Sequence, residues 1–193
     1  TIQADSSLLP FMDVPSTHWA FSSIKHLYDT GVTNGCDTNL YCPDRIVTRA
    51  QMGVFLERAI RDPEFVPPVG TGFFNDIPSN YWARDWIEQL YHDGITGGCE
   101  LQPLRYCPED PVTWGQMAVF LLRAKYGPDY IPHKAEGIFD DVDSNHWARD
   151  WIEQLHRLNI TTGCKTDPLR YCPEEPVPRA QMAVFLTRTF PSW

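Results

Sequence analysis

The sequence carries three copies of one pattern, with shifts of 63 and then 65 residues for the motifs before the loop and of 65 residues each time for those after it. Each copy carries Phe-x-Asp-Val/Ile, Trp-Ala, Gly-Cys, Tyr-Cys-Pro and Gln-Met-x-Val-Phe-Leu in the same order. Self-similarity of this kind is the signature of one supersecondary unit that recurs and stacks on itself. We therefore expect three copies of one unit rather than ordinary unrelated domains. The first motif starts at Phe11, Phe74 and Phe139, and the last at Gln51, Gln116 and Gln181.

The copies are separated by segments whose proline and glycine exclude regular helix. The segments at the two ends of the chain match nothing else in it. The predicted division is an N-terminal arm at 1–10, repeats at 11–61, 74–125 and 139–190, linkers at 62–73 and 126–138, and a C-terminal tail at 191–193.

Each repeat is predicted to form two helices joined by a loop. The first helix is expected to start at the tryptophan of the Trp-Ala pair, because residues such as Trp82 and Leu90 fall at helical spacing. Gly31, Gly94 and Asn159 stand where the C-terminus of that helix favours a residue with positive φ.

The second helix has the clearer signals. Thr48 and Thr113 are each followed by glutamine three residues later, which predicts a capping box. Pro178 replaces the threonine in the third copy, so its cap must be made differently. Apolar residues from Met52 to Ala59 follow the i, i+3, i+4, i+7 pattern of a buried face.

The six cysteines occur as one pair in each repeat. Their even number and their repetition favour three local disulfides, with a structural zinc site as the alternative. No Cys-x-x-Cys knuckle is present and no histidine recurs beside all three pairs, which counts against zinc. Disulfides persist outside the reducing cytosol, so they indicate an extracellular or periplasmic setting. The expected pairs are Cys36 with Cys42, Cys99 with Cys107, and Cys164 with Cys172.

The charge balance limits the partners. Lysine and arginine number 16 against 25 aspartate and glutamate, a formal net charge of −9, whereas phosphate backbones require a basic footprint. We therefore expect no nucleic-acid partner. No stretch approaches the roughly 20 apolar residues that span a bilayer, so the chain is not expected to cross a membrane.

No catalytic constellation is evident, and neither an enzyme nor a cofactor or metal is predicted. Pairing would consume every cysteine, and no Gly-x-Ser-x-Gly elbow is present. His18 and His146 align, but Tyr81 takes their place in the second copy, so we expect partly buried histidines near helix starts. The acidic pairs at 140–141 and 174–175 could serve acid–base chemistry or calcium. Solvated turns and charges at helix N-termini explain them more simply.

The repeat resembles the S-layer homology domain family. The resemblance rests on Phe-x-Asp-Val/Ile, on the Trp, Ile and Leu of a helix, on Gly-Val/Ile-Thr before the loop, and on the Val-Thr-Arg-Ala-Gln sequence from Val47 to Gln51. Family members typically have Phe-x-Pro and Ile-Thr-Arg-Ala-Glu where this chain has Tyr-Cys-Pro and glutamine. The resemblance implies an all-α fold in which three tandem helix–loop–helix repeats form a pseudo-threefold bundle with grooves between neighbours. The cysteine pairs would staple its loops.

In that family the grooves bind secondary cell-wall polysaccharide, often through a pyruvylated sugar, and fasten exported proteins to the bacterial surface. The resemblance thus implies a non-catalytic anchoring module at the bacterial cell surface or in an S-layer. Arg49 and Arg179 occupy the arginine position of the motif, where a guanidinium and free helix N-terminal N–H groups would suit a carboxylate. A surface salt bridge to Asp44 or Glu174 is the alternative role. Trp114 takes this position in the second copy, where an exposed indole could stack on a sugar.

Further candidates remain open. Trp19, Trp82 and Trp147 are candidates for stacking on carbohydrate, although their place at the head of the helix pattern favours the core. Asn159 begins an Asn-x-Thr sequence that would permit a glycan. The alternative function is a self-assembling subunit of a surface layer, sheath or filament, because the repeats occupy almost the whole chain. Residues 1–10 would then reach into another copy of the chain.

Overall fold

The computed structural model describes residues 9–61 and 64–191. These residues form three helix–loop–helix units, so the all-α prediction is confirmed. The first helices of the units are α1 (Phe21–Asp29), α3 (Arg84–His92) and α5 (Arg149–Arg157). The second helices are α2 (Arg49–Ile60), α4 (Trp114–Tyr126) and α6 (Arg179–Thr189).

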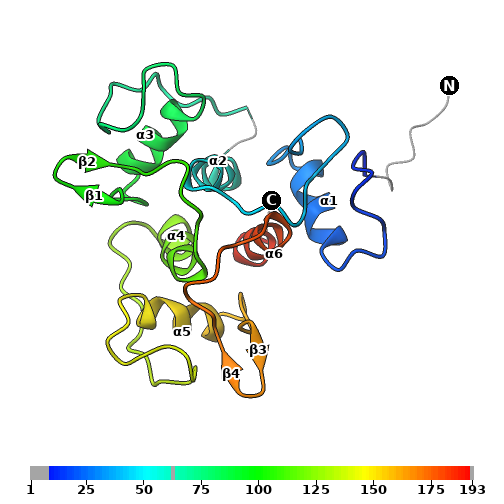
Figure 1. Cartoon of the computed structure of the whole chain (residues 1–193), viewed down its shortest axis with the longest axis vertical. Helices are drawn as coiled ribbons and strands as arrows, with labels where there is room; N and C mark the ends of the chain where they lie inside the picture. The colour runs from blue at the N-terminus through cyan, green and yellow to red at the C-terminus, as the bar shows by residue number, and fades with distance from the viewer. Residues whose placement is uncertain (1–8, 62–63, 192–193) are drawn as a thin grey trace.

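The second helices lie side by side at the centre, and the first helices surround them (Figure 1). Each first helix packs against the second helix of another repeat: α3 on α2, α5 on α4, and α1 on α6. The contact between α1 and α6 joins the first repeat to the third and closes a ring. The expected pseudo-threefold bundle is therefore present, and each packing unit combines helices from two repeats.

Backbone hydrogen bonds join the three repeats at the N-terminal ends of the central helices. The Val47 N–H donates to the Val177 carbonyl (N···O 2.9 Å), Val177 to Val112 (2.9 Å), and Val112 to Val47 (3.0 Å). All three valines are fully buried. Each repeat gives one bond and receives one, so this cycle requires all three copies.

A buried tyrosine from each Tyr-Cys-Pro sequence adds a second link between repeats. Its hydroxyl donates to the backbone carbonyl of the first residue of a central helix. Burial raises the pKa of each phenol, which keeps the hydroxyl a neutral donor. The O···O distances are 2.9 Å from Tyr41 to Arg179, 2.7 Å from Tyr106 to Arg49, and 2.8 Å from Tyr171 to Trp114.

The second helices begin as the sequence predicts. The Thr48 side chain accepts from the Gln51 N–H, and the Gln51 side chain accepts from the Thr48 N–H, which completes the capping box. Thr113 makes the first of these bonds at α4. Pro178 makes no side-chain cap at α6. The Arg179 N–H donates to the Arg45 carbonyl of the first repeat (2.9 Å), a backbone bond that α2 and α4 also make at their first residues.

The first helices begin two residues later than predicted. Trp19, Trp82 and Trp147 lie in the turn before each helix and are 65%, 60% and 60% exposed, so placing them in the core was wrong. The alanine after each tryptophan is buried in its place, as at Ala20. A turn closed by the Phe21 N–H on the His18 carbonyl precedes α1, and it leaves the indole outside the helix.

The ends of the first helices are as predicted. Gly31, Gly94 and Asn159 have φ values of 73°, 69° and 55°, which reverse the chain after each helix. Among the described residues, none of the helices combines the length and the apolar character that crossing a bilayer requires.

Short hairpins distinguish the loops of the second and third repeats. They fall between the two cysteines, where these copies have two residues more than the first, and the first loop forms only an isolated bridge between Asp37 and Leu40. The antiparallel strands are β1 (Glu100–Leu101) with β2 (Leu104–Arg105), and β3 (Lys165–Thr166) with β4 (Leu169–Arg170).

Carboxylates on α3 and α5 hold the chain that precedes them. Glu88 accepts from the N–H groups of Thr71 (2.6 Å) and Gly72 (2.8 Å), and Glu153 does the same for residues 136–138. Lys25 occupies the matching position on α1, which therefore offers no such acceptor. Of the predicted arm, linker and tail, residues 1–8, 62–63 and 192–193 lie outside the described part of the chain.

Glu57 is an ionisable side chain buried between α2 and α3. Its side chain is fully buried, and its Oε2 accepts from Arg61 Nε (3.2 Å). Burial, and next the charge of Asp93, raise the pKa of Glu57 to about 7, although Arg61 acts in the opposite direction. The folded chain thus binds a proton that the unfolded chain releases at about pH 4.3.

We expect Glu57→Gln to remove a pH-dependent loss of stability. The contribution of the protonated Glu57 is fully present below about pH 4.3 and is lost as pH rises to about 7. The neutral amide should therefore raise the free energy of unfolding at about pH 8 by about 1–3 kcal/mol relative to the parent. Urea denaturation across this pH range measures the difference, with the exposed Glu100→Gln as control. Parallel pH profiles for parent and Glu57→Gln would contradict the assignment.

Candidate functional site

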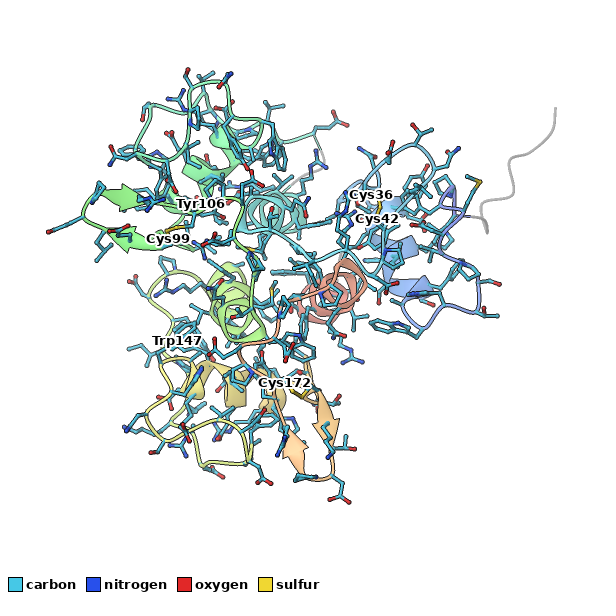
Figure 2. The ribbon with its side chains drawn as sticks, in the orientation of Figure 1. Cys36, Cys42, Cys99, Tyr106, Trp147 and Cys172 are labelled. Carbon is cyan, nitrogen blue, oxygen red and sulfur yellow. A yellow bond between two sulfur atoms is a disulfide. The ribbon has the colours of Figure 1, made fainter. Side chains whose placement is uncertain are left out.

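Two equivalent grooves lie between repeats. Groove 1 has a volume of about 340 Å³ and is lined by the loop after α1, by α2, by Arg179 and by Trp82. Groove 2 has a volume of about 510 Å³ and is lined by the loop after α3, by α4, by Arg49 and by Trp147. Figure 2 labels Trp147 beside α4 and α5. The predicted arginine and tryptophan therefore meet in both grooves, although they come from different repeats.

A buried guanidinium lies at the base of each groove. Arg49 and Arg179 are each 4% exposed. Arg49 Nε donates to the Tyr106 carbonyl (2.8 Å), and Arg179 Nε to the Tyr41 carbonyl (2.7 Å). In the described part of the chain, Nη2 of both arginines is buried without a hydrogen-bond partner. Each groove thus contains a fixed positive charge with an unsatisfied donor.

Desolvation lowers the pKa of both arginines from its usual value. A guanidinium nevertheless remains protonated in proteins, so both side chains stay cationic. The ring of the tyrosine whose carbonyl each arginine binds also lies under the guanidinium. The Cζ-to-centroid distances are 4.8 Å for Arg49 over Tyr106 and 4.6 Å for Arg179 over Tyr41.

The helix N-terminal N–H groups are not free, contrary to the sequence prediction. The Arg49 N–H donates to the Asp110 carbonyl and the Ala50 N–H to the Pro108 carbonyl, both at 2.9 Å. Loop carbonyls from another repeat satisfy these donors because the loops pack directly over the helix ends. The alternative of a surface salt bridge was also wrong, since both arginines are buried and neither forms an ion pair within the described residues. The guanidinium is therefore the group available to a ligand.

A tryptophan side chain also lines each groove. Trp82 and Trp147 are 60% exposed, so an indole is available to a ligand in both grooves. A second tryptophan, on the helix that follows each of these residues, lies under another arginine that lines the groove. The Cζ-to-centroid distances are 5.4 Å for Arg58 over Trp86 and 5.6 Å for Arg123 over Trp151.

The third interface, where α1 packs on α6, differs from the other two. Trp114 replaces the arginine and is only 9% exposed, so the prediction of an exposed indole was wrong. Its ring contacts Phe185 and Tyr171 edge-on, with centroid distances of 5.1 and 5.5 Å. Trp19 remains exposed, but Ser23 stands where the other repeats have the second tryptophan. This interface therefore lacks the buried cation.

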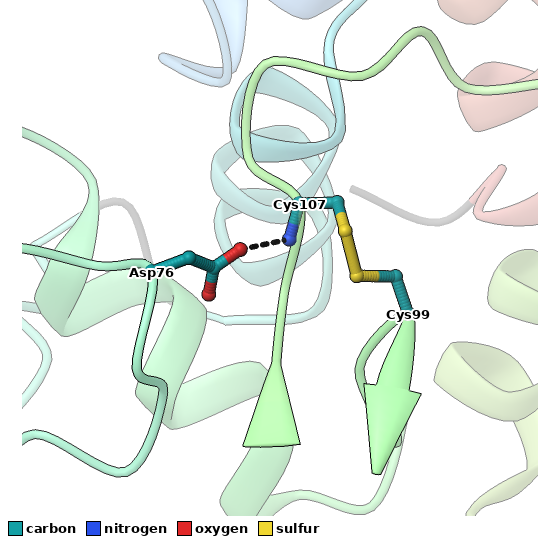
Figure 3. A group of neighbouring side chains, drawn as sticks. All are labelled: Asp76, Cys99 and Cys107. Atoms are coloured by element: carbon teal, nitrogen blue, oxygen red, sulfur yellow. Dashed lines mark hydrogen bonds between the residues drawn. A yellow bond between two sulfur atoms is a disulfide. The ribbon is translucent and has the colours of Figure 1, made fainter. Parts of the chain in front are cut away.

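Three disulfides confirm the predicted cysteine pairs: Cys36 with Cys42, Cys99 with Cys107, and Cys164 with Cys172. The zinc alternative was wrong, because the sulfurs are bonded to each other. Figure 3 shows Asp76 beside the second pair, an arrangement that resembles a metal-ligand set. Its carboxylate instead accepts from the N–H groups of Tyr106 (2.8 Å) and Cys107 (2.7 Å).

The aspartate of Phe-x-Asp has this role in every repeat. Asp13 and Asp141 make the same two bonds to the Tyr-Cys sequences of their own loops. This aspartate belongs to a motif that the sequence reveals, but no function was predicted for it. Its recurrence 28 to 30 residues before the tyrosine was the signal that could have linked the two. The aspartate and the disulfide together fix the tyrosine carbonyl that holds each groove arginine.

The remaining candidates have structural roles or stay untested. His18 and His146 are partly buried, as expected, and their Nδ1 atoms accept from backbone N–H groups two residues on. Glu174 contacts His146 (3.1 Å). It does not place a negative charge in the first turn of α6, which contains no acidic residue. Asn159 is exposed and stays a predicted glycosylation site.

The chain is similar in sequence to a known domain family and to several bacterial proteins. The S-layer homology domain model matches residues 10–52. The chain is 27% identical over 93% of its length to S-layer protein EA1 of Bacillus anthracis, and 31% identical over 60% to a cell surface protein of Thermoanaerobacter kivui. It is also 28% identical over 84% to an endoglucanase of Bacillus sp. (strain KSM-635). The chain spans 20%, 15% and 17% of the lengths of these three relatives.

We expect each disulfide to stabilise the fold independently. Replacing Cys99 and Cys107 together by alanine should cost about 2–3 kcal/mol of unfolding free energy, since the bridge closes a short loop in the unfolded chain. Urea denaturation measures this loss. Replacing Cys164 and Cys172, which have the same separation of 8 residues, repeats the test independently in the third repeat. An unchanged midpoint after either replacement would show that the bridge does not stabilise its loop.

Proposed function

Because the S-layer homology domain model matches the first repeat and the other two repeats share its sequence motifs and helix–loop–helix fold, we propose that this chain is a non-catalytic extracellular module. It binds cell-wall polysaccharide in grooves 1 and 2 and anchors at the bacterial envelope. The buried, unpartnered guanidinium nitrogen in each groove is the observation that carries the proposal. Buried donors in native proteins are almost always satisfied, so a ligand anion supplies the missing partner. The names of the relatives, S-layer and cell surface proteins, agree with this location.

The chemistry of the grooves favours an acidic sugar. A carboxylate, such as that of a pyruvylated residue, accepts charge-assisted hydrogen bonds from a guanidinium. The exposed indole of Trp82 or Trp147 then covers an apolar face of the sugar ring. The net charge of −9 opposes long-range attraction of an acidic polymer. Affinity must therefore come from these short-range contacts, and we expect two occupied grooves for each chain.

We expect the double variant Arg49→Met, Arg179→Met to lose binding. Each arginine supplies a charge-assisted hydrogen bond of about 1.5–3 kcal/mol, so the affinity of each groove for isolated wall polysaccharide should fall about 10- to 150-fold. Isothermal titration calorimetry measures the affinity, and circular dichroism checks that the variant is folded. Trp82→Ala should weaken binding without disturbing the core, because Trp82 is 60% exposed.

Trp19→Ala is the matched control for this experiment. Trp19 is as exposed as Trp82 but belongs to the interface that has Trp114 in place of arginine. Its removal should leave affinity unchanged. Undiminished binding by the double arginine variant would refute the proposal. Ordered polymers that ignore the wall glycan, seen by light scattering or electron microscopy, would favour the self-assembly alternative, which remains a prediction.

A third groove should be obtainable by Trp114→Arg. The Tyr171 carbonyl occupies the place of the Tyr41 and Tyr106 carbonyls that hold Arg179 and Arg49. An arginine at this position should therefore adopt the same arrangement and raise the calorimetric stoichiometry from about two to about three per chain. Trp114→Phe, which keeps the interface apolar, should retain the parent stoichiometry. An unchanged stoichiometry in a folded Trp114→Arg variant would show that the arginine does not define the groove.

A further inference from the structure

One position above the grooves differs in charge between the repeats. Arg45, Asp110 and Glu175 occupy it in the first, second and third repeat. The backbone of this residue has the same role in each case, because its carbonyl accepts from the first N–H of a central helix. The N···O distances are 2.9 Å from Arg179 to Arg45, 2.9 Å from Arg49 to Asp110, and 3.0 Å from Trp114 to Glu175. Three side chains of different charge thus start from equivalent points.

In groove 1 this position adds positive charge. Arg45, Arg58 and Arg179 line the groove, and its lining includes no acidic residue. Desolvation is the largest cause of the lowered pKa of Arg179. Tyr41 acts in the opposite direction, and the charge of Arg45 lowers the pKa further. The two cations are therefore close enough to repel each other.

In groove 2 the same position supplies negative charge. Asp110 lines the groove together with Arg49 and Arg123. Desolvation is again the largest influence on the pKa of Arg49, but here the charge of Asp110 raises it. Asp110 thus partly balances the buried guanidinium of groove 2 before any ligand arrives, whereas the same position in groove 1 adds a second cation. The smaller effects of Asp76 on Arg49 and of Asp13 on Arg179 correspond to each other and do not distinguish the grooves.

The other cationic residues of the two grooves correspond. Arg58 and Arg123 occupy equivalent positions, and each lies over a tryptophan ring. The buried arginines Arg179 and Arg49 also correspond. The exchange of Arg45 for Asp110 therefore accounts for the whole difference in formal charge between the two linings.

We propose that groove 1 selects a group with two negative charges, whereas groove 2 takes a singly charged or neutral sugar. A phosphate monoester or a pair of neighbouring carboxylates has the required charge for groove 1. Such a group neutralises Arg45 and Arg179 together, while in groove 2 its second charge would face Asp110. This inference rests on the proposed function, since it assumes that the grooves bind a glycan. One chain would then recognise two different residues of the same polymer.

Nuclear magnetic resonance of the indole N–H groups tests the selectivity in each groove separately. Trp82 reports on groove 1 and Trp147 on groove 2, and single Trp→Phe variants assign their signals. The probes are methyl phosphate, malonate and acetate at constant ionic strength and about pH 8, where a phosphate monoester is dianionic. We expect Trp82 to respond to methyl phosphate or malonate at a concentration about tenfold or more below that of acetate. Trp147 should not favour either dianion over acetate.

Charge exchange provides the decisive variants. Arg45→Asp should abolish the tenfold preference at Trp82, and Asp110→Arg should create one at Trp147. Both substitutions retain the backbone carbonyl that caps the helix. Glu175→Arg changes the net charge as much as Asp110→Arg does, but it lies at the third interface and should alter neither reporter. A stronger response to methyl phosphate than to malonate identifies a phosphate monoester as the group, and the reverse order identifies paired carboxylates.

Failure of this inference is distinct from failure of the proposed function. If wall polysaccharide shifts both indoles but Trp82 shows no preference for dianions, the selectivity is overturned while anchoring stands. An unaltered preference in Arg45→Asp would overturn it in the same way. If neither the polysaccharide nor any probe shifts either indole, both the selectivity and the groove function are overturned.

Discussion

The structure depends on how the first N–H groups of the three central helices are satisfied. A helix start leaves backbone donors without partners inside the helix. In this chain the donors of each central helix bind carbonyls of a loop from another repeat, as the Arg49 N–H binds Asp110. Together with the cycle through Val47, Val112 and Val177, this arrangement makes every helix start incomplete without a second repeat. The repeats therefore fold as one cooperative body.

The same loops determine what the grooves contain. The disulfide and the aspartate of Phe-x-Asp fix the Tyr-Cys-Pro sequence, whose tyrosine carbonyl binds the Nε of a groove arginine. Nε of each arginine is thus committed to the fold, and Nη1 of Arg49 donates to Gln116 Oε1 (3.4 Å), whereas Nη2 of both arginines has no hydrogen-bond partner among the described residues. A side chain that is half structural in this way is held rigidly, which reduces the entropy lost when an anion binds. Trp114 fills the corresponding place with apolar surface, so one residue difference replaces a buried cation with core packing.

Much of this fold could be predicted because its signals are local and occur three times. The capping box at Thr48, the positive φ of Gly31 and the cysteine pairs each follow from short-range chemistry. The exposure of Trp82 could not, because apolar spacing does not say whether a turn precedes the helix. The burial of Arg49 depends on a loop from another repeat, which no local pattern reveals. The sequence therefore supplied candidate site residues but not their surroundings.

The packing of α1 on α6 has a consequence for how the molecule comes apart. In the pairs α2–α3 and α4–α5 the two helices follow each other in the chain, separated by one linker. Between α1 and α6, by contrast, lie all four other helices and their loops. This contact thus carries the largest loss of chain entropy on closure and regains the most when it separates. We therefore expect the ring to open first at this contact. Because Trp19 lies beside it, the fluorescence of that indole would report the opening before the central helices melt.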